Sequence, residues 1–317
     1  MYAAIDIGSN AVRLAILQDQ SVEATVIRTP IRLGSDCFSQ GSISEKTTKK
    51  LYQALQHYKS IIDDNGVEDY RAVATSALRE ASNSEEVLRV VEEQSGIKIH
   101  LIDGITEGKL IQKAVLTEMD IWRKPHLIMD IGGGSVEFIT ASDGQIHNVA
   151  SLKIGTVRLL QKFDCNKNHP EMDSILKYCV SEMSQMEEVK KFCFRQYKNL
   201  VFIGTGGNFR RIRKLNESTN LNEPGSPIAA EDIYSISDLL ISLNFKQRIE
   251  RLGLRKDRAD VIIPAISLVL SAIETFDLSE IHIPQVGLKD GVIQALKEAD
   301  ALPRSLQLLP DDFGPQS

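Results

Sequence analysis

The chain has 317 residues, which predicts two domains, because a single hydrophobic core stops growing at about 250 to 300 residues. Hydrophobic residues make up 42% and charged residues 25%, which is average for a globular protein and excludes extensive disorder or a fibrous class. The 37 Lys and Arg against 43 Asp and Glu leave a net charge of −6. This balance excludes nucleic-acid binding by bulk charge, so a polyanionic ligand would need locally concentrated basic groups.

The spacing of the cysteines and the length of the apolar stretches indicate the cellular compartment of the protein. No metal-ligand spacing connects the four cysteines, which are Cys37, Cys165, Cys179 and Cys193. No secretory apolar region precedes the first strand-like run. The longest apolar stretch, near residues 261–273, is interrupted by Pro264 and is shorter than the roughly 20 residues of a membrane span. We therefore expect a cytoplasmic protein with reduced thiols and no membrane association.

The chain opens with an apolar run at residues 2–5, a polar turn from Asp6 to Asn10, and a second apolar run at residues 12–17. This pattern predicts a strand, a tight turn and a second strand. Helices are expected at residues 44–62, 84–94 and 106–118, where apolar residues recur at helical spacing after polar starts. Strands that alternate with such helices indicate an α/β architecture.

The strand-turn-strand unit recurs in the second half of the chain. Residues 126–129 lead into Asp130 and three glycines, and residues 136–139 are apolar again. A third glycine turn, residues 204–207, follows the strand-like residues 200–203 without an aspartate and precedes a helix-like stretch at 208–215. Residues 216–226 are expected to form a surface loop. The repeat indicates two related domains that face each other across a cleft, with a boundary near Pro125.

The two Asp-Gly loops can carry chemistry. A carboxylate at this position can hold Mg²⁺ through water, while the glycine and the following backbone N–H groups approach phosphate oxygens. Asp, Gly, Ser and Asn are also ordinary turn formers, so a single loop would suit a plain hairpin. The second copy favours the phosphate-binding interpretation.

These loops resemble the phosphate motifs of the actin, sugar-kinase and chaperone-ATPase superfamily. Within it, five motifs together resemble the exopolyphosphatase/guanosine pentaphosphate phosphatase family: AIDIGSN at 4–10, ATSALREA at 74–81, DIGGGSVE at 130–137, GTVR at 155–158 and GLKDG at 287–291. The resemblance extends from Met1 to about Leu296. It implies two duplicated actin-like α/β domains with mixed sheets, at residues 1–123 and 124–287, with a returning helix at about 288–317. Larger family members carry a further helical domain, which we expect to be absent here.

The resemblance also implies catalytic residues. Glu107 matches the family's water-activating base, although Thr106 replaces the glutamate that usually precedes it. Glu137 is expected to position metal or water, and Arg79 to clamp a phosphate with its fork of donors. Each has an alternative role: Glu107 as a helix-start charge with Thr106 as cap, Glu137 as a solvent-facing strand residue, and Arg79 in a surface ion pair.

The remaining expected site residues bind phosphate or metal. Asp6 and Asp130 are the expected Mg²⁺ carboxylates. The phosphate-binding set is Gly8, Ser9, Asn10, Arg32, Thr75, Ser76, Gly132, Gly133, Gly134, Ser135, Gly204, Gly206 and Gly207, with Arg13 a weaker candidate. The six histidines lack metal-ligand spacing, and no GxxxxGK[ST] nucleotide loop is present. The basic run at residues 210–214 suits a solvated helix face or a channel for extended polyphosphate.

The implied reaction is Mg²⁺-dependent hydrolysis of a terminal phosphoanhydride bond in inorganic polyphosphate or guanosine pentaphosphate. Two alternatives stay open. A kinase of the same superfamily would pass the phosphoryl group to a hydroxyl in place of water, and a non-catalytic sensor would bind polyphosphate or a nucleotide and signal through a partner. Family members are often dimers, so a homodimer is also possible.

Overall fold

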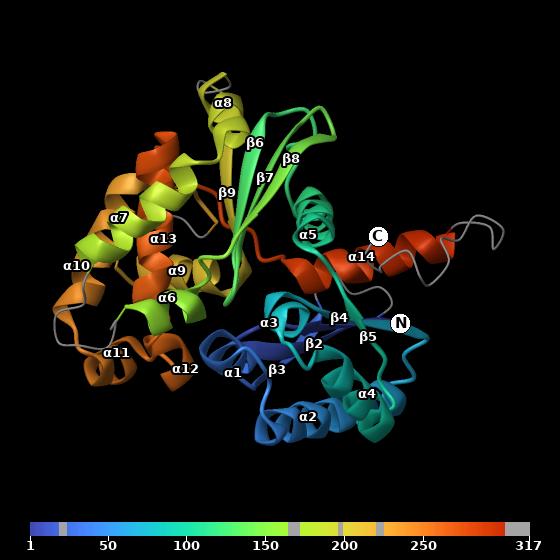
Figure 1. The fold of residues 1–317 in the computed structure, drawn as a ribbon. Coiled ribbons are helices and arrows are strands. Elements are labelled where there is room, and N and C mark those ends of the chain that lie inside the picture. The colour runs from blue at the N-terminus through green and yellow to red at the C-terminus, as the bar shows by residue number, and fades with distance from the viewer. Residues whose placement is uncertain (19–23, 164–171, 196–198, 220–224, 302–317) are drawn as a thin grey trace. The chain divides into compact units, whose positions relative to one another are not determined.

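The computed structural model describes residues 1–317 except 19–23, 164–171, 196–198, 220–224 and 302–317 (Figure 1). The chain folds into two compact units. Unit 1 comprises residues 1–114 and 286–317, and unit 2 comprises residues 115–285. The division falls inside α5 (Gly104–Glu118). Of the returning segment expected at about 288–317, residues 302–317 lie outside the described part of the chain.

Unit 1 is built on a mixed five-stranded sheet with the order β3-β2-β1-β4-β5. Its strands are β1 (Tyr2–Ile7), β2 (Ala11–Leu17), β3 (Thr25–Pro30), β4 (Asp69–Ala74) and β5 (Ile99–Leu101). The hairpin of β1 and β2 is antiparallel, whereas β1, β4 and β5 run parallel. The carboxyl ends of these three parallel strands therefore lie at one edge of the sheet.

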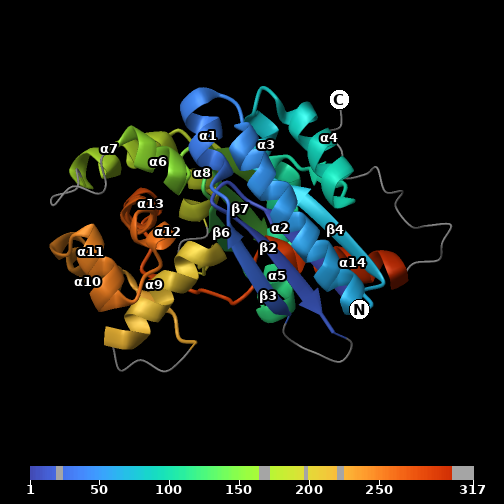
Figure 2. The same ribbon diagram turned by 90° about the horizontal axis from the view of Figure 1, so that it is seen from below.

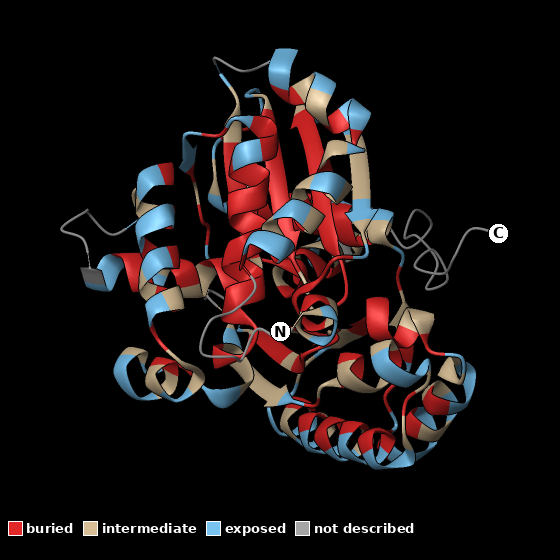
Figure 3. Cartoon of the chain, turned by 60° about the vertical axis from the view of Figure 1, so that its left-hand side comes forward, coloured by how far each residue is buried: buried red, intermediate tan, exposed pale blue. Residues whose placement is uncertain are grey.

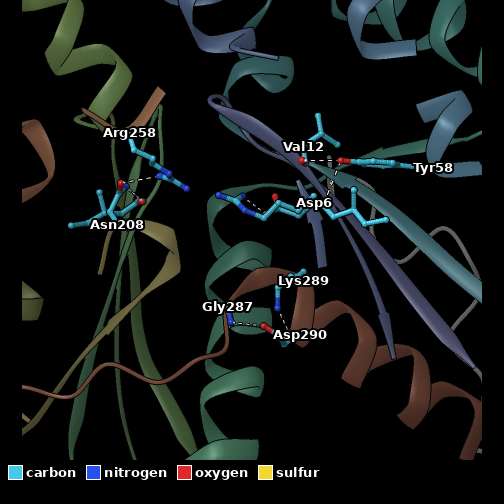
Figure 4. A network of polar contacts seen from close by, with 11 residues as sticks. Asp6, Val12, Tyr58, Asn208, Arg258, Gly287, Lys289 and Asp290 are labelled. Atoms are coloured by element: carbon cyan, nitrogen blue, oxygen red, sulfur yellow. Dashed lines mark hydrogen bonds and ion pairs between the residues drawn. The ribbon is translucent and has the colours of Figure 1, made fainter. Parts of the chain in front are cut away.

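The helices of unit 1 cover both faces of this sheet (Figure 2). They are α1 (Leu33–Gln40), α2 (Glu45–Asp64), α3 (Ser76–Glu80), α4 (Ser84–Ser95), the start of α5, and α14 (Leu288–Ala301). α2 packs beside α4, and α14 packs on β1, β4 and β2. Tyr58 of α2 is fully buried and donates its hydroxyl proton to the Val12 carbonyl at 3.2 Å, which ties α2 to the sheet (Figure 4).

Unit 2 repeats the central part of this arrangement. Its sheet has the order β8-β7-β6-β9, formed by β6 (His126–Ile131), β7 (Val136–Ser142), β8 (Gln145–Leu152) and β9 (Val201–Thr205). β6 and β7 form an antiparallel hairpin, and β9 lies parallel to β6, as β4 does to β1. A two-stranded sheet pairs β10 (Ile228–Ala229) with β11 (Glu280–Ile281).

The helices of unit 2 enclose a continuous apolar core. They are α6 (Thr156–Lys162), α7 (Met172–Ser184), α8 (Glu187–Arg195), α9 (Gly206–Thr219), α10 (Ala230–Ser242), α11 (Phe245–Leu252), α12 (Lys256–Ala259) and α13 (Ile262–Phe276). Nearly every residue of α13 is buried (Figure 3). Lys256–Phe276 is long and apolar enough to cross a membrane, so the apolar helix is longer than expected. Because 94% of its most apolar window is buried inside the protein, it has the character of a core helix.

Two local expectations are corrected by unit 2. The third glycine segment is not a separate turn, since β9 continues to Thr205 and α9 begins at Gly206. Gly204 lies within the strand, where a Cβ would collide with the ring of Phe209. The surface loop expected from residue 216 begins later, because α9 continues to Thr219. Gly204 and Asn216 were misassigned because their local sequence suits turns, whereas packing decides the element.

Candidate active site

The first glycine loop lies at the edge of the unit 1 sheet where β1 and β4 end. The Thr75 N–H donates to the Ile7 carbonyl at 3.3 Å, and the Ser9 and Ser76 hydroxyl oxygens are 2.9 Å apart. Both serines are 2% exposed. Adjacent parallel strands therefore bring together two segments separated by 67 residues.

The segment that starts α1 holds this loop through its main chain. The Arg32 N–H donates to the Asn10 carbonyl at 3.1 Å, and the Gly34 N–H donates to the Ser9 carbonyl at 2.8 Å. Arg32 has φ +65°, a left-handed conformation that is strained for a residue with a side chain. Gly34 is required here, since a Cβ would lie 2.9 Å from the Ser9 Cβ. The expected phosphate residue Arg32 is thus placed directly beside the loop.

Glu107 lies in the first turn of α5, where its charge also suits the helix start, and its side chain is buried with 5% of the residue exposed. Its Oε2 is 3.9 Å from Nη1 of Arg79, and the same Nη1 donates to the Ile102 carbonyl at 2.5 Å. The positive guanidinium of Arg79 thus lies within ion-pair distance of the buried carboxylate of Glu107. The structure therefore brings together the two residues expected to activate water and clamp phosphate.

Asp103, not Thr106, caps α5. The Asp103 Oδ1 accepts a hydrogen bond from the Thr106 N–H at 2.7 Å. This hydrogen bond is the main cause that holds the pKa of Asp103 below its ordinary value, and Arg79 also lowers it. Sequence analysis missed this cap because α5 begins two residues before the expected position, with Gly104 as its first residue.

Asp6 is the cross-strand partner of Arg13 in the β1–β2 hairpin. Its Oδ2 accepts a hydrogen bond from Nη1 of Arg13 at 2.7 Å, and both side chains are largely buried. The charge of the first expected metal carboxylate is therefore offset by a guanidinium.

Unit 2 places four polar residues in a row across its sheet. Asp130 pairs with Thr205 on one side and with Glu137 on the other, and Glu137 pairs with Ser151. Directly opposite residues point to the same face of a sheet, so the four side chains share one face. The Thr205 hydroxyl donates to Asp130 Oδ1 at 2.5 Å, and the Ser151 hydroxyl donates to Glu137 Oε1 at 2.8 Å. Glu137 has no exposed surface, which contradicts the solvent-facing alternative.

In the second glycine loop, residues 132–135, the backbone carbonyls and the backbone N–H groups differ in their hydrogen bonds. The carbonyls of Gly132, Gly133 and Gly134 all accept hydrogen bonds from residues 155–158, and the Ser135 carbonyl accepts from the Gly132 N–H at 3.0 Å. Among the residues that the structure describes, no acceptor faces the N–H groups of Gly133, Gly134 and Ser135. Consecutive backbone donors of this kind can bind an anion.

The start of α9 adds two contacts to this region. Gly206 has φ +87°, and a Cβ there would lie 2.8 Å from Asp130 Oδ1, so glycine lets α9 begin directly behind the carboxylate. Gly207 follows in the first turn of α9. Asn208, which sequence analysis missed, donates from Nδ2 to the Ile131 carbonyl at 2.9 Å and accepts from Arg258 at 3.1 Å (Figure 4). The position of Asn208 directly after two glycines could have marked it as a candidate site residue. Nothing in the sequence pointed to Arg258.

The oxygen ligands of unit 2 suit Mg²⁺ better than those of unit 1. Asp130 and Glu137 are adjacent carboxylates with hydroxyls on either side, an oxygen-rich arrangement that fits a hard divalent cation. Asp6 fits less well, because its carboxylate already faces Arg13. Within the described residues, no cluster of three or more His, Cys, Asp or Glu side chains is present, so water and phosphate oxygens would have to complete any coordination shell.

Comparison with known proteins identifies the family of this chain. The model of the Ppx/GppA phosphatase family matches residues 21–299. The chain belongs to this family. Asp6 with Gly8 and Asp130 with Gly132 occupy equivalent turns of the β1–β2 and β6–β7 hairpins of the two units.

Several relatives of the family are similar over most of this chain. A bifunctional 3-dehydroquinate synthase/phosphatase of Fusobacterium nucleatum is 29% identical over 294 residues, an alignment that covers 86% of this chain and 43% of the relative. The chain thus spans less than half the length of that protein. The crystal structure of the Aquifex aeolicus Ppx/GppA family member has a TM-score of 0.77 at 26% identity and covers 95% of this chain and 99% of its own.

An exopolyphosphatase of Cytophaga hutchinsonii has a TM-score of 0.84 at 23% identity, covering 94% of this chain and 97% of its own. At this identity the likeness shows the fold alone. Together the two structures confirm the expected fold class, an actin-like α/β pair with mixed sheets flanked by helices.

Proposed function

We propose that this chain is a hydrolase that releases the terminal phosphate of inorganic polyphosphate or guanosine pentaphosphate, with Glu107 activating the attacking water. The buried Glu107 carboxylate beside Arg79 is the observation that carries the proposal. Family membership supports the reaction class, and the Cytophaga hutchinsonii protein of the same fold is named an exopolyphosphatase.

Each unit by itself carries groups suited to a different part of the chemistry. In unit 1, Glu107 accepts the proton of water, while Arg79 keeps the carboxylate in place and binds a phosphate oxygen. In unit 2, the N–H groups of Gly133, Gly134 and Ser135 bind phosphoryl oxygens. Phosphoryl transfer depends mostly on positioning and charge stabilisation, which are the tasks these groups perform.

Asp130 and Glu137 would hold Mg²⁺, which when bound offsets the negative charge of the phosphate oxygens. The hydroxyl of Thr205 fixes the Asp130 carboxylate, and that of Ser151 fixes Glu137, so both present their remaining oxygens in a defined direction. A cytoplasmic location and a homodimer are further parts of the proposal.

Phosphate release from purified protein without any acceptor tests this function. Polyphosphate and guanosine pentaphosphate should each be assayed with Mg²⁺ and with excess chelator. The name of the Fusobacterium nucleatum relative specifies no phosphatase substrate, so p-nitrophenyl phosphate serves as a monoester control. A hydrolase releases phosphate from an anhydride substrate. Release that requires an added hydroxyl acceptor would indicate a kinase, and binding without release would indicate a sensor.

A further inference from the structure

Residues 155–158, here called the strap, lie against the second glycine loop, and the role argued for them rests on the proposed function. The strap donates four backbone hydrogen bonds to the second glycine loop. The N–H groups of Gly155, Thr156, Val157 and Arg158 donate to carbonyls of Gly132 to Gly134 at 2.8–3.4 Å. Gly155 must be glycine, because a Cβ would lie 2.5 Å from the Gly133 carbonyl carbon. The strap therefore lies in close contact with the loop backbone.

One side chain of the strap, that of Arg158, also donates a hydrogen bond to the loop. The Nε of Arg158 donates to the Gly134 carbonyl at 2.7 Å, a shorter contact than the 3.2 Å from the Gly155 N–H to the same oxygen. The Gly134 carbonyl and the Ser135 N–H belong to one peptide plane and point in opposite directions. Holding this carbonyl toward the strap therefore turns the Ser135 N–H away from the strap.

The first loop shows why such a side chain is needed in the second. In unit 1 the Ser9 and Asn10 carbonyls accept main-chain hydrogen bonds from Gly34 and Arg32, just as Gly133 and Gly134 do from Val157 and Gly155. The first loop has side chains at its two central positions, whereas the second has glycines. Glycine permits many more backbone conformations, so the Gly134–Ser135 peptide, which follows two glycines, rotates more easily. The second loop thus gains most from an added anchor.

We propose that Arg158 is a positioning residue, whose Nε holds the Gly134–Ser135 peptide so that the Ser135 N–H faces the bound phosphoryl group. Arg158 is half-buried and bonds the loop from the side of its carbonyls. Its role depends on a donor at the Nε position and not on its charge.

Three substitutions separate the donor from the charge. In Arg158→Gln the amide nitrogen takes the place of Nε along the side chain, so the donor remains while the charge is lost. Arg158→Met has a methyl carbon at that place and removes both. We expect Arg158→Met to raise KM for phosphate release about three- to tenfold, the effect of losing about one hydrogen bond, while Arg158→Gln recovers most of the loss. Arg158→Lys keeps the charge without a donor at Nε and should recover less than Gln.

A binding measurement keeps the test independent of catalysis. Inorganic phosphate added to ¹⁵N-labelled protein should shift the Ser135 amide resonance in the wild type and in Arg158→Gln, with a weaker apparent affinity in Arg158→Met. Equal weakening in the Gln and Met variants, with recovery in Lys, would show that the charge matters, and wild-type affinity in all three would show no role; either result overturns the proposal. If phosphate shifts the resonance but no anhydride is hydrolysed, the proposed function fails and the positioning role survives. Melting temperatures of the three variants identify any loss through unfolding.

Discussion

Asp130 and Glu137 are direct cross-strand partners on β6 and β7, whereas the matching position opposite Asp6 holds Arg13. The two hairpins therefore have the same strand pairing but different charges at this position. One places two carboxylates side by side, and the other places a carboxylate beside a guanidinium. Unit 2 gathers two carboxylates that would repel each other without a cation. In unit 1 the guanidinium of Arg13 offsets the charge of the Asp6 carboxylate, so this carboxylate needs no metal ion for charge balance.

This contrast predicts that metal affinity depends on Asp130 and much less on Asp6. Asp130→Asn should weaken Mn²⁺ binding at least about tenfold, in the range for loss of a group that holds a metal. Asp6→Asn should leave it within about threefold. Mn²⁺ binding followed by electron paramagnetic resonance measures both. Equal weakening by the two substitutions would return Asp6 to the metal site.

Replacing Glu107 with Gln should lower phosphate release at least about a hundredfold, because a neutral amide cannot accept the proton of water. Substrate affinity should survive, since size and hydrogen-bonding capacity are largely kept. Turnover and equilibrium binding of polyphosphate, measured on one preparation, check this.

The exposed Glu86 on α4 of the same unit provides a matched control for Glu107. Glu86→Gln should leave turnover and melting temperature unchanged. Near-wild-type turnover in Glu107→Gln would shift the role of base to another carboxylate, with Glu137 the first to examine. Unfolding of Glu107→Gln would instead mark Glu107 as a structural residue.

Asp103 makes the stability of α5 depend on pH. Its pKa is lower in the folded state than the ordinary value of 3.8, so its ionised form stabilises the fold fully above that value. The contribution is lost as pH falls through the lower folded-state pKa. Asp103→Ala should cost about 0.5–2 kcal/mol of unfolding free energy at pH 7, typical for loss of an N-cap. Urea unfolding at pH 7 and at pH 3 should show this difference shrinking, and a difference that grows in acid would contradict the cap.

Gly291 lets α14 approach α5 within unit 1, because a Cβ at this position would collide with the Leu110 carbonyl. Gly291→Ala should therefore destabilise the protein by about 1–3 kcal/mol, even though alanine is the better helix former. Lys297→Ala, at an exposed position of the same helix, is the control and should change stability little. Denaturant midpoints compare them. An unchanged midpoint in Gly291→Ala would mean that the helices can separate at little cost.

Local sequence was sufficient for the two hairpins, for α2 and α4, and for the two Asp-Gly loops. The alternation of apolar runs with Asp-Gly turns predicted both hairpins, and helical periodicity predicted α2 and α4 to within two residues of their observed ends. The resemblance of five motifs predicted the fold class. These features are local because strand and helix periods, and the turn preferences of Asp and Gly, depend on residues a few positions apart.

Only the tertiary structure decided which charges meet. The register of the strands places Glu137 beside Asp130 and Arg13 beside Asp6, and a shift of one residue would turn these side chains to the opposite face. Parallel strand order brings Ser76 to Ser9, and the path of the strap brings Arg158 to Gly134. These contacts join residues far apart in the chain, and their partners are chosen by packing and register, which no short stretch of sequence encodes by itself.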